Sequence, residues 1–146
     1  MESYVERTNV EVLRVRADMN GGGPAEAMQR LEAKLPILKG RKFYGVFRLL
    51  PEGEEYFACV ERTSSDDPAA MGVETGTIPG GLYARRKVMD WERVIAEGRL
   101  GELFQEMIRN CPVDPDRPEI EYYRSRTELH LLLPVRVRPS PGEGRG

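Results

Sequence analysis

The hydrophobic positions of the first 40 residues predict a strand followed by a helix. Residues 10–17 are rich in β-branched side chains, which favour extended structure. The glycine cluster at 20–23 is interpreted as a turn, because it lacks the lysine and hydroxyl residue of a phosphate-binding loop. Pro24 suits the first turn of a helix. Apolar residues then recur at helical spacing and are interpreted as core: Met28, Leu31, Leu35 and Leu38.

Two β-rich segments follow this helix. Residues 42–50 and 55–62 are separated by a short stretch of proline, glutamate and glycine, which is typical of a turn. The pattern predicts an antiparallel hairpin. Residues 63–70 are polar and interpreted as a loop, and residues 71–81 as a connector with some extended character.

The second half repeats this order of elements. A strand is predicted at 82–89, and Asp90 is interpreted as the N-cap of a helix that begins at Trp91. The apolar residues before and after Gly98 fall on opposite sides of a single helix, so we expect a break there and a new helix at 99–109. A proline-rich loop then leads to two final strands, at 119–125 and 127–137.

The predicted fold class is therefore α+β, with duplicated β-α-β-β halves, antiparallel sheet pairing and helices packed on one sheet face. The halves are placed at about 10–62 and 82–137, within one domain that covers residues 1–137. Residues 138–146 combine glycine, proline and charge, which predicts a flexible tail.

Composition narrows the class of protein. The 146 residues are 40% hydrophobic, and 22 basic against 24 acidic side chains give a net charge of −2, which argues against direct nucleic-acid binding. No apolar run reaches the roughly 18 residues that a bilayer span needs, and the first residues do not resemble a signal peptide. We therefore expect a cytoplasmic protein with no membrane contact.

The cysteine and histidine content predicts neither a disulfide framework nor a metal site. Cys59 and Cys111 are interpreted as two free thiols of a reducing compartment. One histidine and no closely spaced cysteine pair leave little basis for zinc binding. No cofactor is expected.

Several segments of the chain together carry a resemblance to one known family. They are Ile78-Pro79-Gly80-Gly81-Leu82-Tyr83-Ala84, Leu103-Phe104, Pro118-Glu119-Ile120-Glu121-Tyr122-Tyr123, and 129–135, which ends in Pro134-Val135. These segments resemble the GyrI-like small-molecule-binding domain, which is also the effector-binding module of multidrug-sensing bacterial transcription activators. The match covers about residues 10–137, and the hairpin at 40–46 and 55–60 resembles that of some members.

The resemblance implies a duplicated fold whose halves meet around a central hydrophobic pocket, which would form a central ligand groove. Family members bind bulky aromatic or cationic compounds there, often with a buried carboxylate and tyrosines. Some stand-alone relatives hydrolyse cyclopropane-bearing DNA alkylators, and others bind DNA gyrase. No DNA-binding segment precedes the first strand at residue 10, so a stand-alone member is expected.

The last strand departs from the family pattern. The sensing members commonly have an acidic residue four positions before the proline of this strand, and here that residue is His130. Glu128 lies two residues earlier, on the same strand face. A Glu128–His130 pair could neutralise itself and suit a neutral aromatic ligand, or could activate a water molecule. The alternative is that both side chains face solvent on an outer strand.

Other candidate residues are aromatic or acidic. Matching the family's E-x-Y pattern favours Glu121 and Tyr123 as pocket residues, although a surface ion pair of Glu121 with a nearby arginine is an alternative. The further candidates for ligand contacts, each also a candidate core residue, are Tyr44, Tyr56, Tyr83 and Trp91. The basic run Arg85-Arg86-Lys87 is interpreted as a solvated strand edge.

These observations predict a stand-alone small-molecule-binding protein that captures a hydrophobic or aromatic compound. The first alternative is a hydrolase that detoxifies an electrophile, with Glu128 or Glu121 activating water and His130 or a tyrosine as proton partner. The second is a protein-binding inhibitor of gyrase. A homodimer is compatible with the predicted strand edges.

Overall fold

The computed structural model describes residues 2–137, so the predicted tail at 138–146 lies outside the described residues. The chain divides into two compact units. We call residues 2–8 and 80–137 the terminal unit, and residues 9–79 the internal unit. Both mix antiparallel strands with helices, as predicted for the class of fold. Within residues 2–137, no helix has the length and apolar content needed to cross a bilayer.

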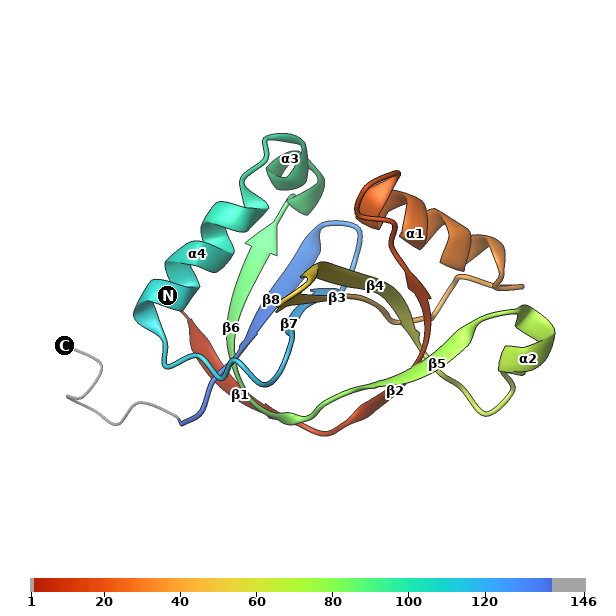
Figure 1. Cartoon of the computed structure of the whole chain (residues 1–146), viewed down its shortest axis with the longest axis horizontal. Coiled ribbons are helices and arrows are strands. Elements are labelled where there is room, and N and C mark those ends of the chain that lie inside the picture. Colours follow the sequence, from red (N-terminus) through yellow and green to blue (C-terminus); the bar gives the residue numbers. More distant parts are fainter. Residues whose placement is uncertain (1, 138–146) are drawn as a thin grey trace. The chain divides into compact units, whose positions relative to one another are not determined.

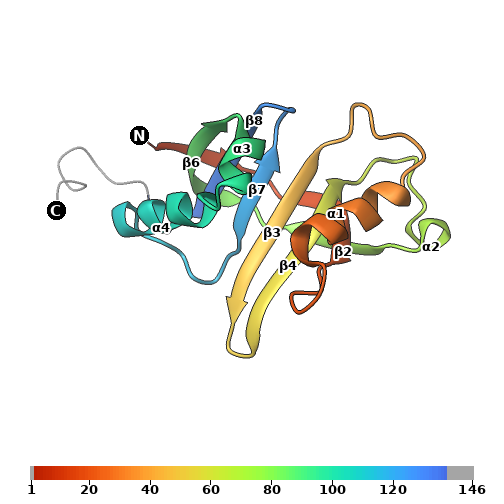
Figure 2. The same cartoon turned by 90° about the horizontal axis from the view of Figure 1, so that it is seen from above.

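The internal unit is a four-stranded antiparallel sheet with one helix on it. The strands pair in the order β3-β4-β2-β5, and α1 lies across β4 and β2 (Figures 1 and 2). Its elements are β2 (Val10–Arg16), α1 (Gly23–Ala33), β3 (Phe43–Leu50), β4 (Gly53–Glu61), α2 (Pro68–Met71) and β5 (Glu74–Ile78).

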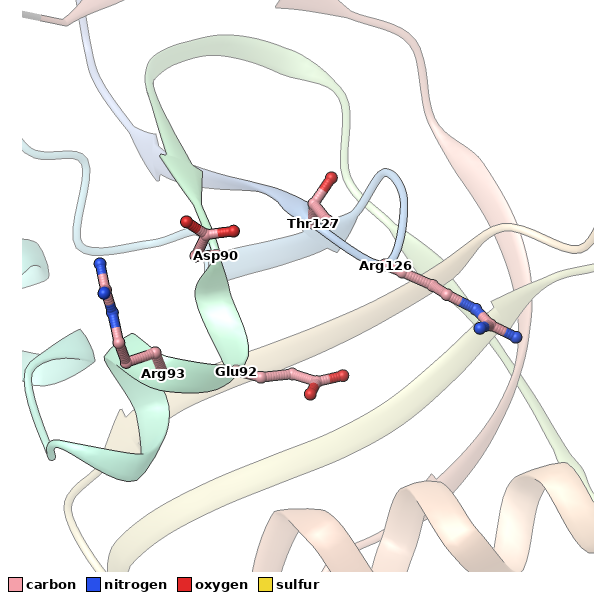
Figure 3. A pocket seen from close by; sticks show the side chains of 5 residues that line it. All are labelled: Asp90, Glu92, Arg93, Arg126 and Thr127. Carbon is pink, nitrogen blue, oxygen red and sulfur yellow. The ribbon is translucent and has the colours of Figure 1, made fainter.

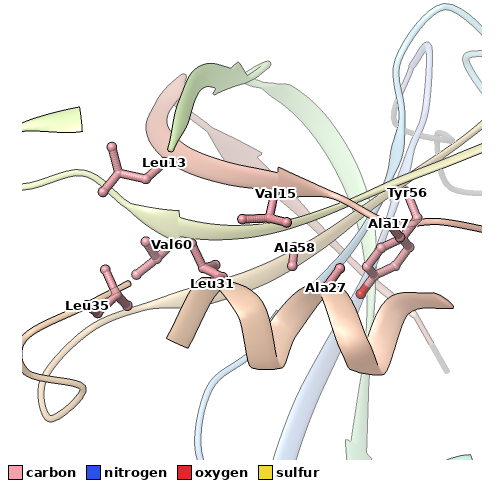
Figure 4. Close-up of a cluster of buried hydrophobic side chains, with 9 residues drawn as sticks. All are labelled: Leu13, Val15, Ala17, Ala27, Leu31, Leu35, Tyr56, Ala58 and Val60. Carbon is pink, nitrogen blue, oxygen red and sulfur yellow. The ribbon is translucent and has the colours of Figure 1, made fainter. Parts of the chain in front are cut away.

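The predicted apolar stripe of α1 forms the core of this unit. Ala27 and Leu31 are fully buried against the sheet, where Leu13 and Val60 project from neighbouring strands (Figure 4). Burial of one leucine side chain contributes about 1.5–3 kcal/mol. The predicted hairpin is confirmed, since Leu50 pairs with Gly53 across a two-residue turn.

The terminal unit likewise contains four antiparallel strands, which pair in the order β1-β6-β8-β7. Figure 1 shows α3 and α4 following one another beside β6. The predicted helix break is confirmed, because Gly98 has a φ of 69° between the two helices. The elements are β1 (Ser3–Arg7), β6 (Gly81–Met89), α3 (Trp91–Ala96), α4 (Leu100–Asn110), β7 (Glu119–Tyr123) and β8 (Glu128–Pro134).

The two units share one order of elements. In each unit, a strand is followed by a helical segment and then by a hairpin of two strands. The first strand pairs with the second strand of the hairpin. Each unit also has one outer strand, β5 or β1, that the hydrophobic pattern did not predict. β1 is contributed by residues far from the rest of its unit in sequence, and its pairing with β6 is a tertiary event that a local pattern does not encode.

Asp90 occupies the predicted N-cap position of α3, which begins at Trp91, but its side chain makes no capping hydrogen bond and its backbone is left-handed, with a φ of 51°. Two local interpretations are wrong. The loop at 63–70 contains the start of α2, which Asp67 caps by accepting a hydrogen bond from the backbone of Ala70. The basic run on β6 is not a strand edge, since β1 covers that side and Arg86 is half-buried against Glu2.

Candidate functional site

Strand β8 divides the predicted site residues between two faces of the terminal unit. Leu129, Leu131 and Leu133 pack against the helices in one hydrophobic cluster. Because side chains alternate along a strand, Glu128 and His130 project from the opposite, helix-free face. We call these the helix face and the open face.

On the open face, His130 is buried, with 6% of its surface exposed, and makes a short contact with the carboxylate of Glu128. The edge of its ring meets Tyr122 at a centroid distance of 5.7 Å, and the guanidinium of Arg7 lies 5.6 Å from the centroid of Tyr122. The hydrogen bond to His130 lowers the pKa of Glu128. The predicted Glu128–His130 pair therefore exists and is mutually satisfied.

Glu121 and Tyr123 lie on the helix face of β7, away from this pair. Strand register places Tyr122 directly opposite His130 and Tyr123 opposite Leu129, and directly paired residues share a face. The structure therefore does not bring Glu121 and Tyr123 together with Glu128 and His130, as a single groove would require. The family pattern indicated the residues, but the register decides their face.

The helix face of β7 holds a compact group of aromatic and acidic side chains. The hydroxyl of Tyr123 donates a 2.7 Å hydrogen bond to Glu121 Oε1. Trp91 meets the Tyr123 ring edge-on at 5.0 Å, and its indole N–H donates to the carbonyl of Ser125 at 3.0 Å. Glu121, Tyr123 and Trp91 are all half-buried, so each keeps some surface exposed. We call these three residues the aromatic–carboxylate cluster.

Glu119 extends this cluster along the same face of β7. Burial raises the pKa of Glu119, and the charge of Glu121 raises it further. The sequence-based prediction missed this residue. Its spacing of two from Glu121 on one predicted strand was a signal that could have identified it.

The other predicted aromatic residues have structural surroundings. Tyr83 is fully buried, with the guanidinium of Arg117 lying 4.8 Å from its ring centroid. Tyr44 and Tyr56 are buried on opposite faces of the internal sheet, and Tyr56 belongs to the core beneath α1. In the part of the chain that the structure describes, no group of three histidine, cysteine or acidic side chains could hold a metal ion.

Comparison with known proteins identifies relatives of the fold. No protein-family model matches the chain, and no curated protein is significantly similar to it. Solved structures do match over most of their length. One is an integron cassette protein from Vibrio cholerae, with 16% identity, coverage of 92% of this chain and 95% of that one, and a TM-score of 0.65.

Two further structures are described by a ligand or an activity. One is SAV2435 bound to tetraphenylphosphonium, with 11% identity, coverage of 93% of this chain and 94% of that one, and a TM-score of 0.63. The other is described as a hydrolase from Listeria innocua, with 13% identity, coverage of 92% and 91%, and a TM-score of 0.57. At these identities the likeness shows a shared fold and no more.

Proposed function

We propose that the chain is a small-molecule-binding protein that holds a bulky aromatic compound on the aromatic–carboxylate cluster of the terminal unit. The observation that carries this proposal is the cluster itself. Trp91 and Tyr123 offer partly exposed aromatic surface, and the carboxylate of Glu121 lies beside them. Aromatic walls with one convergent polar group are typical of ligand sites.

A positive charge on the ligand is part of the proposal. Cation–π contacts with tryptophan or tyrosine contribute about 0.5–2 kcal/mol each, and a neighbouring carboxylate adds electrostatic attraction. Glu119 and Glu121 lie on the helix face, whereas Glu128, which is hydrogen-bonded to His130, lies on the open face. This arrangement changes the expectation of a neutral ligand, which rested on His130 lying in the site.

The fold relatives support the same proposal. A protein of this fold binds tetraphenylphosphonium, an aromatic cation. We further propose that the two units derive from a duplication and that the chain is a GyrI-like protein. The shared order of elements in the two units supports the duplication. Cytoplasmic location, gyrase binding and a homodimer stay predictions from the sequence.

The test uses tetraphenylphosphonium and the fluorescence of Trp91, which is the sole tryptophan of the chain. We expect saturable quenching, and about tenfold weaker binding in Glu121→Gln, which keeps the shape of the side chain and removes its charge. Glu128→Gln is the matched control on the open face and is expected to bind like the wild type. Absence of saturable binding, or equal losses in both variants, would contradict the proposal.

A hydrolase is the second candidate, favoured by the hydrogen bond between Tyr123 and Glu121. Glu121 could take a proton from water as the water oxygen bonds to a strained-ring carbon, and Tyr123 could return a proton to the carbon that leaves. Incubation with a cyclopropane-bearing alkylator, followed by mass spectrometry, tests this. The product should gain the mass of one water, and Glu121→Gln should abolish the gain. An unchanged compound would exclude this activity for that substrate.

A further inference from the structure

Glu119 and Glu121 form a pair of carboxylates on the helix face of β7. Because they are two residues apart on one strand, both side chains project from this face, and their attachment points lie roughly 6.6 Å apart. Tyr123 follows on the same face, and Trp91 meets the ring of Tyr123. Glu119 therefore adds a second carboxylate to the proposed ligand site, on the side of Glu121 that is away from the aromatic rings.

The carboxylate of Glu119 is half-buried next to a strand that presents leucine side chains to the helix face. Among residues 2–137, no hydrogen bond or ion pair engages the side chain of Glu119. Burial raises the pKa of Glu119 most, and the charge of Glu121 raises it further. A half-buried negative charge without a counter-ion is unfavourable, so a ligand that brings a positive charge to Glu119 gains affinity there.

Other poorly exposed carboxylates of the chain have a basic partner. The side chain of Asp66 is 5% exposed and accepts from Arg41 at 2.7 Å, and that of Glu2 is 10% exposed and accepts from Arg86 at 2.5 Å. Burial of a carboxylate in this protein is thus accompanied by a guanidinium group in these two places. At Glu119 the corresponding cation is left for a ligand to supply.

An open hollow at the end of β6 lacks this combination of burial and missing counter-ion. The residues that line it are Asp90, Glu92, Arg93, Arg126 and Thr127. All five are exposed, and Figure 3 shows Arg93 extending away from Glu92 and Arg126. Water solvates exposed charges, so these side chains are stable without a ligand, in contrast to the half-buried carboxylate of Glu119.

We propose that the ligand of the aromatic–carboxylate cluster is an aromatic dication whose two positive centres lie about as far apart as Glu119 and Glu121. One centre pairs with Glu121 beside the rings of Tyr123 and Trp91, and the other pairs with Glu119. This inference rests on the proposed function, since it assigns a second charge to the ligand of the same site. A monocation would leave one of the two carboxylates without a counter-ion, whereas a dication also offsets the repulsion between them.

Three bipyridinium compounds test the number and the spacing of the ligand's charges. Methyl viologen is a flat dication with its charged nitrogens at opposite ends, separated by about the distance between the two glutamates. The singly methylated compound has the same skeleton and one charge, and diquat has two charges that lie close together. Calorimetric titration should show that methyl viologen binds at least about tenfold more tightly than either of the others. Equal binding of methyl viologen and the monocation, or of methyl viologen and diquat, would overturn the inference.

Two variants locate the second charge. Glu119→Gln should lower the affinity ratio of methyl viologen to the monocation from about ten to about one. Glu128→Gln makes the same change to the net charge of −2 but lies on the open face, so it should keep the ratio of the wild type. Circular dichroism checks that both variants are folded. Equal ratios in the two variants would overturn the inference, because the preference would then come from the overall charge of the protein.

Tetraphenylphosphonium separates this inference from the proposed function. If tetraphenylphosphonium binds and methyl viologen shows no preference over the monocation, the dication inference is wrong and the aromatic site stands. If neither tetraphenylphosphonium nor any of the bipyridinium compounds binds, the proposed function is wrong and the dication inference is wrong with it.

Discussion

The helix-facing sides of β7 and β3 carry opposite chemistry, although the two strands take equivalent places in their units. In the terminal unit Tyr122 of β7 pairs with His130 of β8, and in the internal unit Tyr44 of β3 pairs with Cys59 of β4. The two units can be aligned on these cross-strand pairs. On this alignment Glu121 corresponds to Phe43. In the internal unit this face is apolar and packs on the core beneath α1, while in the terminal unit it presents carboxylates and aromatic rings.

This difference indicates a division of roles between the two strands. An aromatic residue such as Phe43 stabilises its unit by removing apolar surface from water. Glu119 gains nothing comparable, because burial of a carboxylate opposes folding and raises its pKa. Polar groups kept at a cost to stability are expected where a ligand is to be recognised.

The open faces differ in a related way. In both units the next strand of the sheet places a basic residue opposite the aligned position. Lys87 of β6 pairs with His130, and Arg14 of β2 pairs with Cys59. Burial raises the pKa of Cys59 to about 12, so its thiol stays neutral and behaves as a small apolar side chain. His130 instead needs Glu128 as a polar partner.

The largest expected effect is on the internal core. Leu31→Ala should lower the free energy of unfolding by about 2–5 kcal/mol, because Leu31 of α1 is fully buried against the sheet and the substitution leaves a cavity. Urea denaturation followed by circular dichroism measures this. The matched control is Leu49→Ala, at a position that is 76% exposed, where a change within about 0.5 kcal/mol is expected.

The second effect compares the aligned positions directly. Phe43→Ala should cost about 2 kcal/mol, less than for a fully buried phenylalanine because Phe43 is only partly buried. Glu121→Ala should cost less, about 1 kcal/mol, because it removes only the acceptor of the Tyr123 hydroxyl and no apolar core contact. If urea denaturation shows similar losses for both variants, the division between a stabilising strand and a ligand-facing strand is wrong.

A smaller effect is expected at Glu119. Its pKa is raised on folding, so its favourable contribution is complete below the ordinary glutamate value and is lost as the pH rises through the folded value. Glu119→Gln should therefore stabilise the protein at pH 7 by about 0.5 kcal/mol. Melting curves at several pH values test this, and the gain should vanish in acid. A variant less stable than wild type at pH 7 would show that the carboxylate is well paired.

The smallest effect is expected at Glu128, where the sign is reversed. The hydrogen bond to His130 lowers the pKa of Glu128, so the pair stabilises the fold above the ordinary value of 4.5 and this contribution is lost as the pH falls through the folded value. Glu128→Gln should be slightly less stable than wild type near neutral pH. Melting curves of the two proteins should converge in acid, and a constant difference down to low pH would count against this pairing.

Patterns local in sequence predicted most of the helices and strands. The stripe containing Leu31 and the break at Gly98 are examples, because helical period and glycine conformation are properties of short segments. β1 and the face on which Glu121 lies depend instead on pairing between distant strands. A shift of one residue in that pairing would exchange the two faces. The sequence therefore predicted the candidate residues, but not which of them share a face of the sheet.

The most direct test of the central claim is a crystal structure of the protein with bound tetraphenylphosphonium. The ligand site we propose predicts phenyl rings of the ligand in contact with Trp91 and Tyr123, and the phosphonium centre closest to Glu121. A ligand seated instead against His130 and Tyr122 on the open face would contradict the proposal.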